Sequence, residues 1–328
     1  MMADIEKQEL FPVVDISYII ERYQSVDGWR DKDFQQDAAV RDLVDQICTG
    51  FTRWGFLYIT GHGIPECDIQ NAFNGALEFF NSEDKSKKEV RRGGGIALGY
   101  VPHDSEVFDK NRPNDIKEAL DFLPDSQLSE KMEHFASKTV SSSKKLFLEC
   151  HQLVQKFLRL LAMALDLDVE HYISLHKNIG DHKQNGTTMR LLYYPQIKSR
   201  LDVQEGQLRC GEHTDYGTVT LLFQDQVGGL EVKSPSGEYV KAKPIPGTIV
   251  VNAGDLLHTW SGGRYKATMH RVVPPVSCSS SYRQSIAFFT HPDYAVNIDT
   301  KNEQGQSEVR NAHDHLKEMF DRTIQVEH

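Results

Sequence analysis

The distribution of apolar residues along the chain changes near its middle. In the N-terminal half, apolar side chains recur at helical spacing over Phe34–Phe51, Ile69–Phe80 and Lys144–Asp168, which predicts three amphipathic helices. Short apolar runs at Phe11–Ile16 and Gly55–Thr60 predict two strands among these helices. This half is therefore predicted to be rich in helix.

From Thr188 onward, short runs of Val, Leu, Phe and Thr alternate with Gly and Pro turns. This pattern is typical of an antiparallel β-sandwich or barrel. The predicted strands lie at Met189–Tyr194, Thr218–Phe223, Gly229–Val232, Thr248–Val251, Thr268–Val273 and Ser285–Phe289. A last helix is predicted over Ser307–Phe320. We expect a helical and mixed region at 1–187, a β-core at 188–292 and a helical extension at 293–328.

Composition and charge exclude several classes of protein. The 328 residues include 37 Lys and Arg against 47 Asp and Glu, and a net charge of −10 argues against a nucleic-acid binder. No apolar run reaches the roughly 18 residues of a membrane helix, so no membrane association is expected, and the acidic N-terminus is no secretory signal.

The cysteines are widely spaced without a CxxC pair, which predicts reduced thiols in a cytoplasmic protein. They are Cys48, Cys67, Cys150, Cys210 and Cys278.

The segment Gly211–Gly217 carries the most informative chemistry. On a strand, His213 and Asp215 would point to the same face. His270 lies in a second strand-like run and offers another imidazole. Two histidines and one carboxylate form the facial triad of non-haem Fe(II) oxygenases. A lone HxD pattern arises often by chance, and a surface position is the alternative for each residue.

A second constellation follows the second histidine. Arg283 and Ser285 share a strand face, and an arginine fork with a hydroxyl donor can hold the far carboxylate of a dicarboxylate whose near end chelates iron. A surface ion pair is the alternative for Arg283. By the same alternation Arg190, Leu192 and Tyr194 share a face. Tyr194 is either a further hydrogen-bond donor to that acid or a core tyrosine.

Other candidate residues are assigned structural roles. Arg91 and Arg92 precede a glycine run that lacks the strand and helix of a phosphate loop, and they are predicted to form a solvated patch. His62 is predicted to be a turn residue. His258 and His291 flank core strands, and either can line the pocket, but capping or surface positions are favoured.

The chain resembles the isopenicillin N synthase-like family of 2-oxoglutarate- and Fe(II)-dependent oxygenases over nearly its whole length. Phe11–Asp15 is similar to the family's opening strand, and Trp54–Ile64 is similar to its segment ending in His-Gly-Ile. Pro246–Asp255 is similar to the strand pair before the second metal histidine. Together with these segments, the HxD…H triad followed by RxS carries the resemblance.

The resemblance implies a double-stranded β-helix, or jelly roll, as a mostly β core flanked by the α-rich N-terminal half. It also implies that His213, Asp215 and His270 bind iron, and that Arg283 and Ser285 hold the distal carboxylate of 2-oxoglutarate. The chain departs from the family where plant members often have Asn-Tyr-Tyr-Pro. The tyrosine carries over as Tyr194, but leucine replaces the asparagine, which puts one polar contact in doubt.

By resemblance, the activity is that of a dioxygenase that hydroxylates, desaturates or cyclises a small organic metabolite and releases succinate and carbon dioxide. Fe(II), 2-oxoglutarate and dioxygen are the expected cofactors, with ascorbate as a candidate activator, in a monomer or weak homodimer. Two alternatives remain: an oxidase of the same fold that does not use 2-oxoglutarate, and a non-catalytic binding module. The substrate pocket is predicted to draw on Tyr100–Phe108, the face of Arg190 and the C-terminal helix, which is predicted to close over the barrel.

Overall fold

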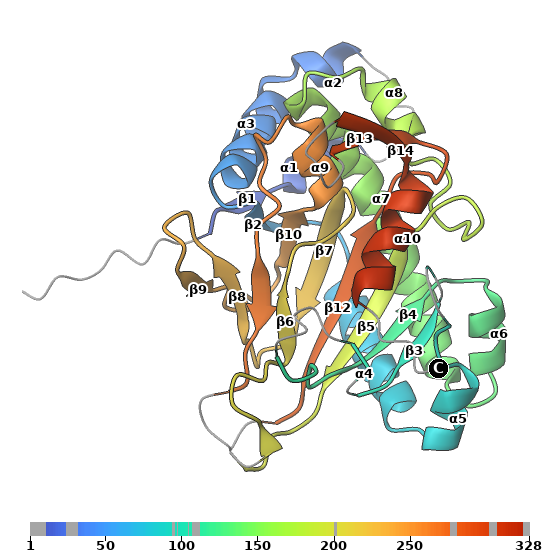
Figure 1. The fold of residues 1–328 in the computed structure, drawn as a ribbon. Coiled ribbons are helices and arrows are strands. Elements are labelled where there is room, and N and C mark those ends of the chain that lie inside the picture. The colour runs from blue at the N-terminus through green and yellow to red at the C-terminus, as the bar shows by residue number, and fades with distance from the viewer. Residues whose placement is uncertain are drawn as a thin grey trace, which may run out of the picture.

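Two β-sheets facing each other form the centre of the molecule (Figure 1). The computed structural model describes residues 11–23, 32–93, 96, 98–103, 105–106, 112–199, 202–275, 281–301 and 307–323. Cys278 therefore lies outside the described residues. The large sheet has eight strands in the order β1-β2-β10-β7-β12-β5-β4-β3, and the small sheet has four in the order β6-β11-β8-β9.

Both halves of the chain contribute strands to the large sheet. Its members are β1 (Val13–Asp15), β2 (Phe56–Thr60), β3 (Gly99–Val101), β4 (Glu118–Phe122), β5 (Thr188–Tyr194), β7 (Val219–Gln224), β10 (Ile249–Ala253) and β12 (Arg283–Thr290). The small sheet contains β6 (Cys210–His213), β8 (Leu230–Lys233), β9 (Tyr239–Lys241) and β11 (His270–Val272). All pairs in the two sheets are antiparallel except β1 with β2.

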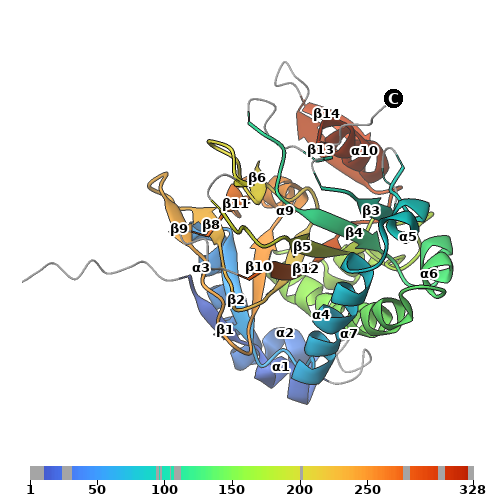
Figure 2. The same ribbon diagram turned by 90° about the horizontal axis from the view of Figure 1, so that it is seen from below.

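Helices cover the face of the large sheet that is turned away from the small sheet. Figure 2 shows α4 and α7 on one side of the large sheet, with β6, β11 and α10 on the other. The helices are α1 (Ser17–Arg22), α2 (Lys32–Gln36), α3 (Ala38–Arg53), α4 (Glu66–Phe80), α5 (Asp84–Glu89), α6 (Gln127–Met132), α7 (Ser137–Ala164), α8 (Val169–Ser174), α9 (Asp255–Trp260) and α10 (Ala312–Thr323). The helix predicted over Phe34–Phe51 corresponds to α2 and α3 together. The helices predicted over Ile69–Phe80 and Lys144–Asp168 correspond to α4 and α7.

Strand alternation explains why the large sheet is buried on both faces. On β5 and β12, Leu191 and Phe288 pack into the core beneath the helices. Their neighbours Arg190, Leu192 and Ala287 point to the opposite face and line a cavity between the sheets. Adjacent residues of one strand thus have different roles: one packs in the core, and the next lines the cavity.

The prediction of a helix beginning at Ser307 is wrong for its first five residues. Ser307–Asn311 forms β14, which pairs with β13 (Asn297–Lys301). The helix α10 begins only at Ala312, because the Asn311 side chain accepts a hydrogen bond from Asp314 N at 2.8 Å, as N-cap residues do. Val309 lies on this strand and is 64% exposed, so it does not belong to a buried helix face.

Within the described part of the chain, no helix combines the length and the apolar character needed to cross a membrane.

Candidate metal centre and cosubstrate pocket

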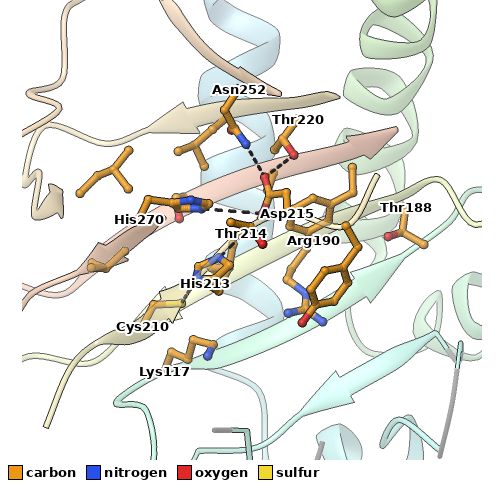
Figure 3. A pocket seen from close by; sticks show the side chains of 18 of the residues that line it. Lys117, Thr188, Arg190, Cys210, His213, Thr214, Asp215, Thr220, Asn252 and His270 are labelled. Atoms are coloured by element: carbon orange, nitrogen blue, oxygen red, sulfur yellow. Dashed lines mark hydrogen bonds and ion pairs between the residues drawn. The ribbon is translucent and has the colours of Figure 1, made fainter. Parts of the chain in front are cut away.

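His213, Asp215 and His270 meet at the inner face of the small sheet (Figure 3). His213 ends β6 and lies directly opposite His270, which begins β11. Asp215 follows the end of β6, so its placement comes from the turn after the strand. One ligand atom from each residue lies within 4.8 Å of the others. Asp215 Oδ1 is 3.8 Å from His213 Nε2 and 3.7 Å from His270 Nε2.

Backbone carbonyls hold both imidazoles in the form that can bind a metal. His213 Nδ1 lies 2.8 Å from Gly211 O, and His270 Nδ1 lies 3.0 Å from Thr268 O. A carbonyl only accepts hydrogen bonds, so each Nδ1 carries the proton and each Nε2 keeps a lone pair. Burial also lowers the pKa of His270 to about 4, which keeps its imidazole neutral. Such bonds orient histidine ligands in metal sites.

The other oxygen of Asp215 is fixed by two side chains that the sequence did not reveal. Asn252 Nδ2 donates to Asp215 Oδ2 at 2.7 Å, and Thr220 Oγ1 donates to the same oxygen. Burial raises the pKa of Asp215, but His270, His213 and these two hydrogen bonds outweigh burial and lower it. The carboxylate is therefore charged, and its free oxygen Oδ1 is turned toward both histidines. Two neutral imidazoles and one carboxylate are a donor set that fits Fe(II).

Arg283 lies in the same cavity without a carboxylate partner. It is 1% exposed, and no carboxylate in the described part of the chain forms an ion pair with it. Its Nη1 donates to Ser285 Oγ at 3.1 Å, and its Nη2 donates to Gln224 Oε1 at 3.4 Å. The guanidinium carbon lies 4.6 Å from the centre of the Tyr194 ring. A buried cation needs a compensating anion, and a carboxylate of 2-oxoglutarate fits this position.

One cavity joins the triad to Arg283. All three residues of the triad and Arg283 line this same cavity. Ser285 and Tyr194 line it, as the strand alternation predicts. Tyr194 packs its ring against Arg283 and is 2% exposed.

A buried group of ion pairs, here called the Arg190 cluster, forms the wall beyond the triad. Arg190 donates to Asp121 Oδ1 from Nε at 2.7 Å and to Oδ2 from Nη2 at 2.9 Å, and its Nη1 lies 3.2 Å from Glu106 Oε1. Lys117 bridges Glu106, at 2.9 Å, and Asp115. Arg92 completes the cluster with a 2.7 Å contact to Asp121.

The predicted solvated position of Arg92 is wrong, because its side chain is 3% exposed and ion-paired. The preference for a surface or capping position at His291 is also wrong, since His291 is buried and lines the cavity. His258 does not line it and bonds Tyr265 O through Nδ1 at 2.6 Å. His62 is confirmed as a turn residue, because its Nδ1 accepts from Ile64 N at 3.1 Å.

The C-terminal helix α10 contributes Phe320 to the lining of the cavity. The Phe320 ring meets the Tyr216 ring edge-on, with centroids 5.9 Å apart, and the Arg92 guanidinium carbon lies 4.4 Å from the Phe320 centroid. Phe320 and Arg190 confirm two of the three regions expected to line the pocket. In the third region, residues 104 and 107–108 lie outside the described residues.

Two family models match the chain. Residues 185–292 match the 2OG-Fe(II) oxygenase superfamily, and residues 12–142 match the N-terminal region of non-haem dioxygenases in morphine synthesis. Among curated relatives, a homoarginine-6-hydroxylase of Glycine max is 32% identical over 97% of this chain and 94% of its own length. A proline hydroxylase of Petromyces alliaceus is 30% identical over 86% of this chain and 90% of its own.

Solved structures agree with these matches. A full-length Neurospora crassa protein, in complex with alpha-KG (2-oxoglutarate) and thymine, has a TM-score of 0.76 and 30% identity, covering 96% of this chain and 97% of its own. The same protein in complex with alpha-KG alone also has a TM-score of 0.76. The jelly-roll fold and the resemblance to isopenicillin N synthase-like oxygenases are thereby confirmed. The chain belongs to the 2OG-Fe(II) oxygenase superfamily and is a 2-oxoglutarate- and Fe(II)-dependent dioxygenase.

Proposed function

We propose that this dioxygenase hydroxylates a small organic molecule at a centre where His213, Asp215 and His270 hold Fe(II), and where Arg283 and Ser285 hold the far carboxylate of 2-oxoglutarate. The observation that carries the proposal is one cavity with a converging His-Asp-His donor set and a buried guanidinium that has no carboxylate partner in the described chain. Tyr194 supports the guanidinium through its ring.

The residues of the chain bind and orient the reactants. Fe(II), 2-oxoglutarate and dioxygen supply the oxidising chemistry when bound. His213 and His270 offer Nε2, because their Nδ1 protons are donated to backbone carbonyls. Asn252 and Thr220 hold Asp215 so that Oδ1 faces the histidines. Arg283 fixes the direction in which the cosubstrate lies, and the apolar cavity walls exclude water.

Hydroxylation is favoured over desaturation or ring closure by the relatives. Two of them are named hydroxylases, of homoarginine and of proline. The Neurospora crassa structure contains thymine beside alpha-KG. All three molecules are small, as is the substrate proposed for this enzyme.

Anaerobic binding of 2-oxoglutarate to the Fe(II)-loaded protein tests the proposal. A charge-transfer absorption band is expected in the wild type, because the keto acid would chelate the iron. His270→Ala should lose the band together with the iron, and Arg283→Met should keep the iron but require far more 2-oxoglutarate for the band. Normal iron binding by His270→Ala, or unchanged 2-oxoglutarate affinity in Arg283→Met, would overturn the assignment of these roles.

We also propose that the enzyme works in the cytoplasm, as a monomer or weak homodimer, with ascorbate as an activator. The four described cysteines, Cys48, Cys67, Cys150 and Cys210, are all free thiols, which supports a reducing compartment. The division into regions 1–187, 188–292 and 293–328 stays a prediction. Light scattering of the purified chain and limited proteolysis test the oligomeric state and the region boundaries.

A further inference from the structure

The charges of the Arg190 cluster balance within the described chain. Its cations are Arg92, Lys117 and Arg190, and its anions are Glu106, Asp115 and Asp121. Asp121, which lines the cavity, accepts hydrogen bonds on both oxygens from two arginines. No carboxylate in this cluster is left to pair with a cationic ligand, and each of the three cations already has a carboxylate partner.

The charges at the metal and cosubstrate positions balance as well. Asp215 contributes one negative charge and Arg283 one positive charge, while His213 and His270 bind a metal as neutral imidazoles. Fe(II) adds two positive charges and 2-oxoglutarate two negative ones. With both groups in place, this side of the cavity has no net charge to offer to another ligand.

The remaining polar walls near the Arg190 cluster are uncharged. They include the Thr188 hydroxyl, the Tyr216 phenol and the His291 imidazole. Burial lowers the pKa of His291 to about 3, so its ring is neutral at physiological pH. Phe320 and Phe289 add apolar surface. Each charged group of a substrate would therefore be buried here without a counter-charge from the described residues, which is energetically costly.

Resting on the function proposed above, the structure assigns a substrate class: we infer that the enzyme acts on a small, uncharged molecule with carbonyl or amide groups. Arg190 lines the cavity (Figure 3) and has five N–H donors, of which its bonds to Asp121 and Glu106 use at most four. His291 ring nitrogens have no hydrogen-bond partner among the described residues. These two side chains supply a donor for a carbonyl and a donor or acceptor for an amide.

Calorimetry on the Mn(II)- and 2-oxoglutarate-loaded protein tests the inference without turnover. The uncharged probes are thymine, uracil and 2-pyrrolidinone, and the charged probes are L-homoarginine, a net cation, and L-proline, a zwitterion with two charged groups and no net charge. We expect at least one uncharged probe to bind about 10-fold or more tightly than either charged probe, because burying a charged group without a partner is costly. Equal or tighter binding of a charged probe, or binding of none of the uncharged probes, would overturn the assignment.

A charge introduced into the substrate wall gives a second, independent test. Thr188 is half-buried and lines the cavity, so Thr188→Asp adds a carboxylate without removing a partner from the Arg190 cluster. This variant should gain affinity for L-homoarginine and lose it for the uncharged probe, whereas Thr188→Asn should do neither. If Thr188→Asp gains nothing for the cation while still binding 2-oxoglutarate, the inference fails.

Binding of 2-oxoglutarate, measured first in the same protein, distinguishes a wrong assignment of the function from a wrong assignment of the substrate class. If 2-oxoglutarate does not bind, the proposed function itself is wrong. If it binds while a charged probe is preferred, only the substrate class is wrong.

Discussion

His213 and His270 are direct cross-strand partners in the antiparallel pair β6–β11, with ring centroids 4.2 Å apart. The two imidazoles are therefore neighbours because of the register in which β6 and β11 pair. A slip of one residue would turn one imidazole to the other face of the sheet. The proposed metal centre accordingly depends on a correctly folded small sheet.

Replacing one of these histidines should remove the iron. For His270→Ala we expect loss of Fe(II) binding and of oxygen consumption, because two remaining ligands hold a labile divalent ion poorly. Metal content after anaerobic loading is the measurement. His258→Ala is the matched control, since His258 bonds a backbone carbonyl and does not line the cavity. Full iron content in His270→Ala would remove this residue from the triad.

Arg283→Lys should weaken 2-oxoglutarate binding while keeping the positive charge. The lysine loses the two-pronged carboxylate contact, worth about 1.5–3 kcal/mol, so the KM for 2-oxoglutarate should rise about 10- to 150-fold. Ser285→Ala should have a milder effect, and Arg41→Lys, at an exposed position on α3, should have none. Unchanged KM values with lost primary-substrate affinity would mean that Arg283 holds the substrate.

Phe320→Ala should uncouple the reaction. Phe320 lines the cavity beside Tyr216, and removing its ring should leave the site less shielded from water. The ratio of succinate formed to substrate oxidised should rise, while the KM for 2-oxoglutarate stays near that of the wild type. Phe320→Ala tests the role of the helix more specifically than deletion of the chain from Ser307, because the deletion would also remove β14 from its pair with β13. Lys317→Ala, exposed on the same helix, is the control.

If Phe320 served packing alone, Phe320→Ala would lower the Tm and leave the ratio unchanged. Measuring both quantities on one preparation distinguishes the two roles of the residue.

Asp121→Asn should destabilise the fold strongly. Removing one partner from a buried ion pair leaves Arg190 and Arg92 undercompensated, which typically costs about 3–5 kcal/mol of unfolding free energy. Asp125→Asn breaks the exposed pair with Lys144 and should cost less than about 1 kcal/mol. Urea unfolding compares the two variants. A similar, small loss in both would show that the Arg190 cluster contributes little to stability.

Glu149 should make the stability depend on pH near neutrality. Burial, followed by the negative charge of Asp68, raises the pKa of Glu149 to about 7, and one of its oxygens has no hydrogen-bond partner in the described chain. A carboxyl with a raised pKa holds its proton more tightly when folded. Its contribution is therefore present at low pH and is lost as the pH rises through about 7.

Glu149→Gln should accordingly reduce the fall in Tm between pH 5.5 and pH 8. Glu133→Gln, at an exposed position on the surface, is the control and should leave that fall unchanged. An identical pH profile in wild type and Glu149→Gln would contradict the assignment.

Local pattern predicted much of the fold. The helical spacing of Val40, Leu43 and Ile47 corresponds to the buried face of α3. The alternation in Met189–Tyr194 correctly separated the core residues of β5 from its cavity residues. Such predictions succeed because side-chain direction follows directly from the period of the backbone. The prediction for Ser307–Asn311 failed because antiparallel pairing with β13, the strand just before it in the sequence, overrode a weak helical pattern.

The chemical types at the site were also readable from the sequence. His213, Asp215, Arg283 and Ser285 stand out because each lies in a short motif, HxD or RxS, and His270 stands out as the imidazole of a second strand-like run. Arg283 and Ser285 do share a face of β12, whereas Asp215 follows the end of β6. Their meeting in one cavity did not follow from any one motif. It required the fold that the family resemblance implied.

Sequence alone thus determined the strand and helix periods, the motif residues and the family to which they point. Tertiary structure decided which charges are compensated. Arg92 lies in a polar segment that looks solvent-exposed, and His291 flanks a strand like any surface histidine, yet both side chains are buried in the folded chain. Ion pairing joins residues from separate strands and loops through space, and burial depends on what packs over a side chain. Ion pairing and burial do not recur at a regular spacing along the chain. Only the folded arrangement therefore reveals that the charges beside the proposed metal centre cancel.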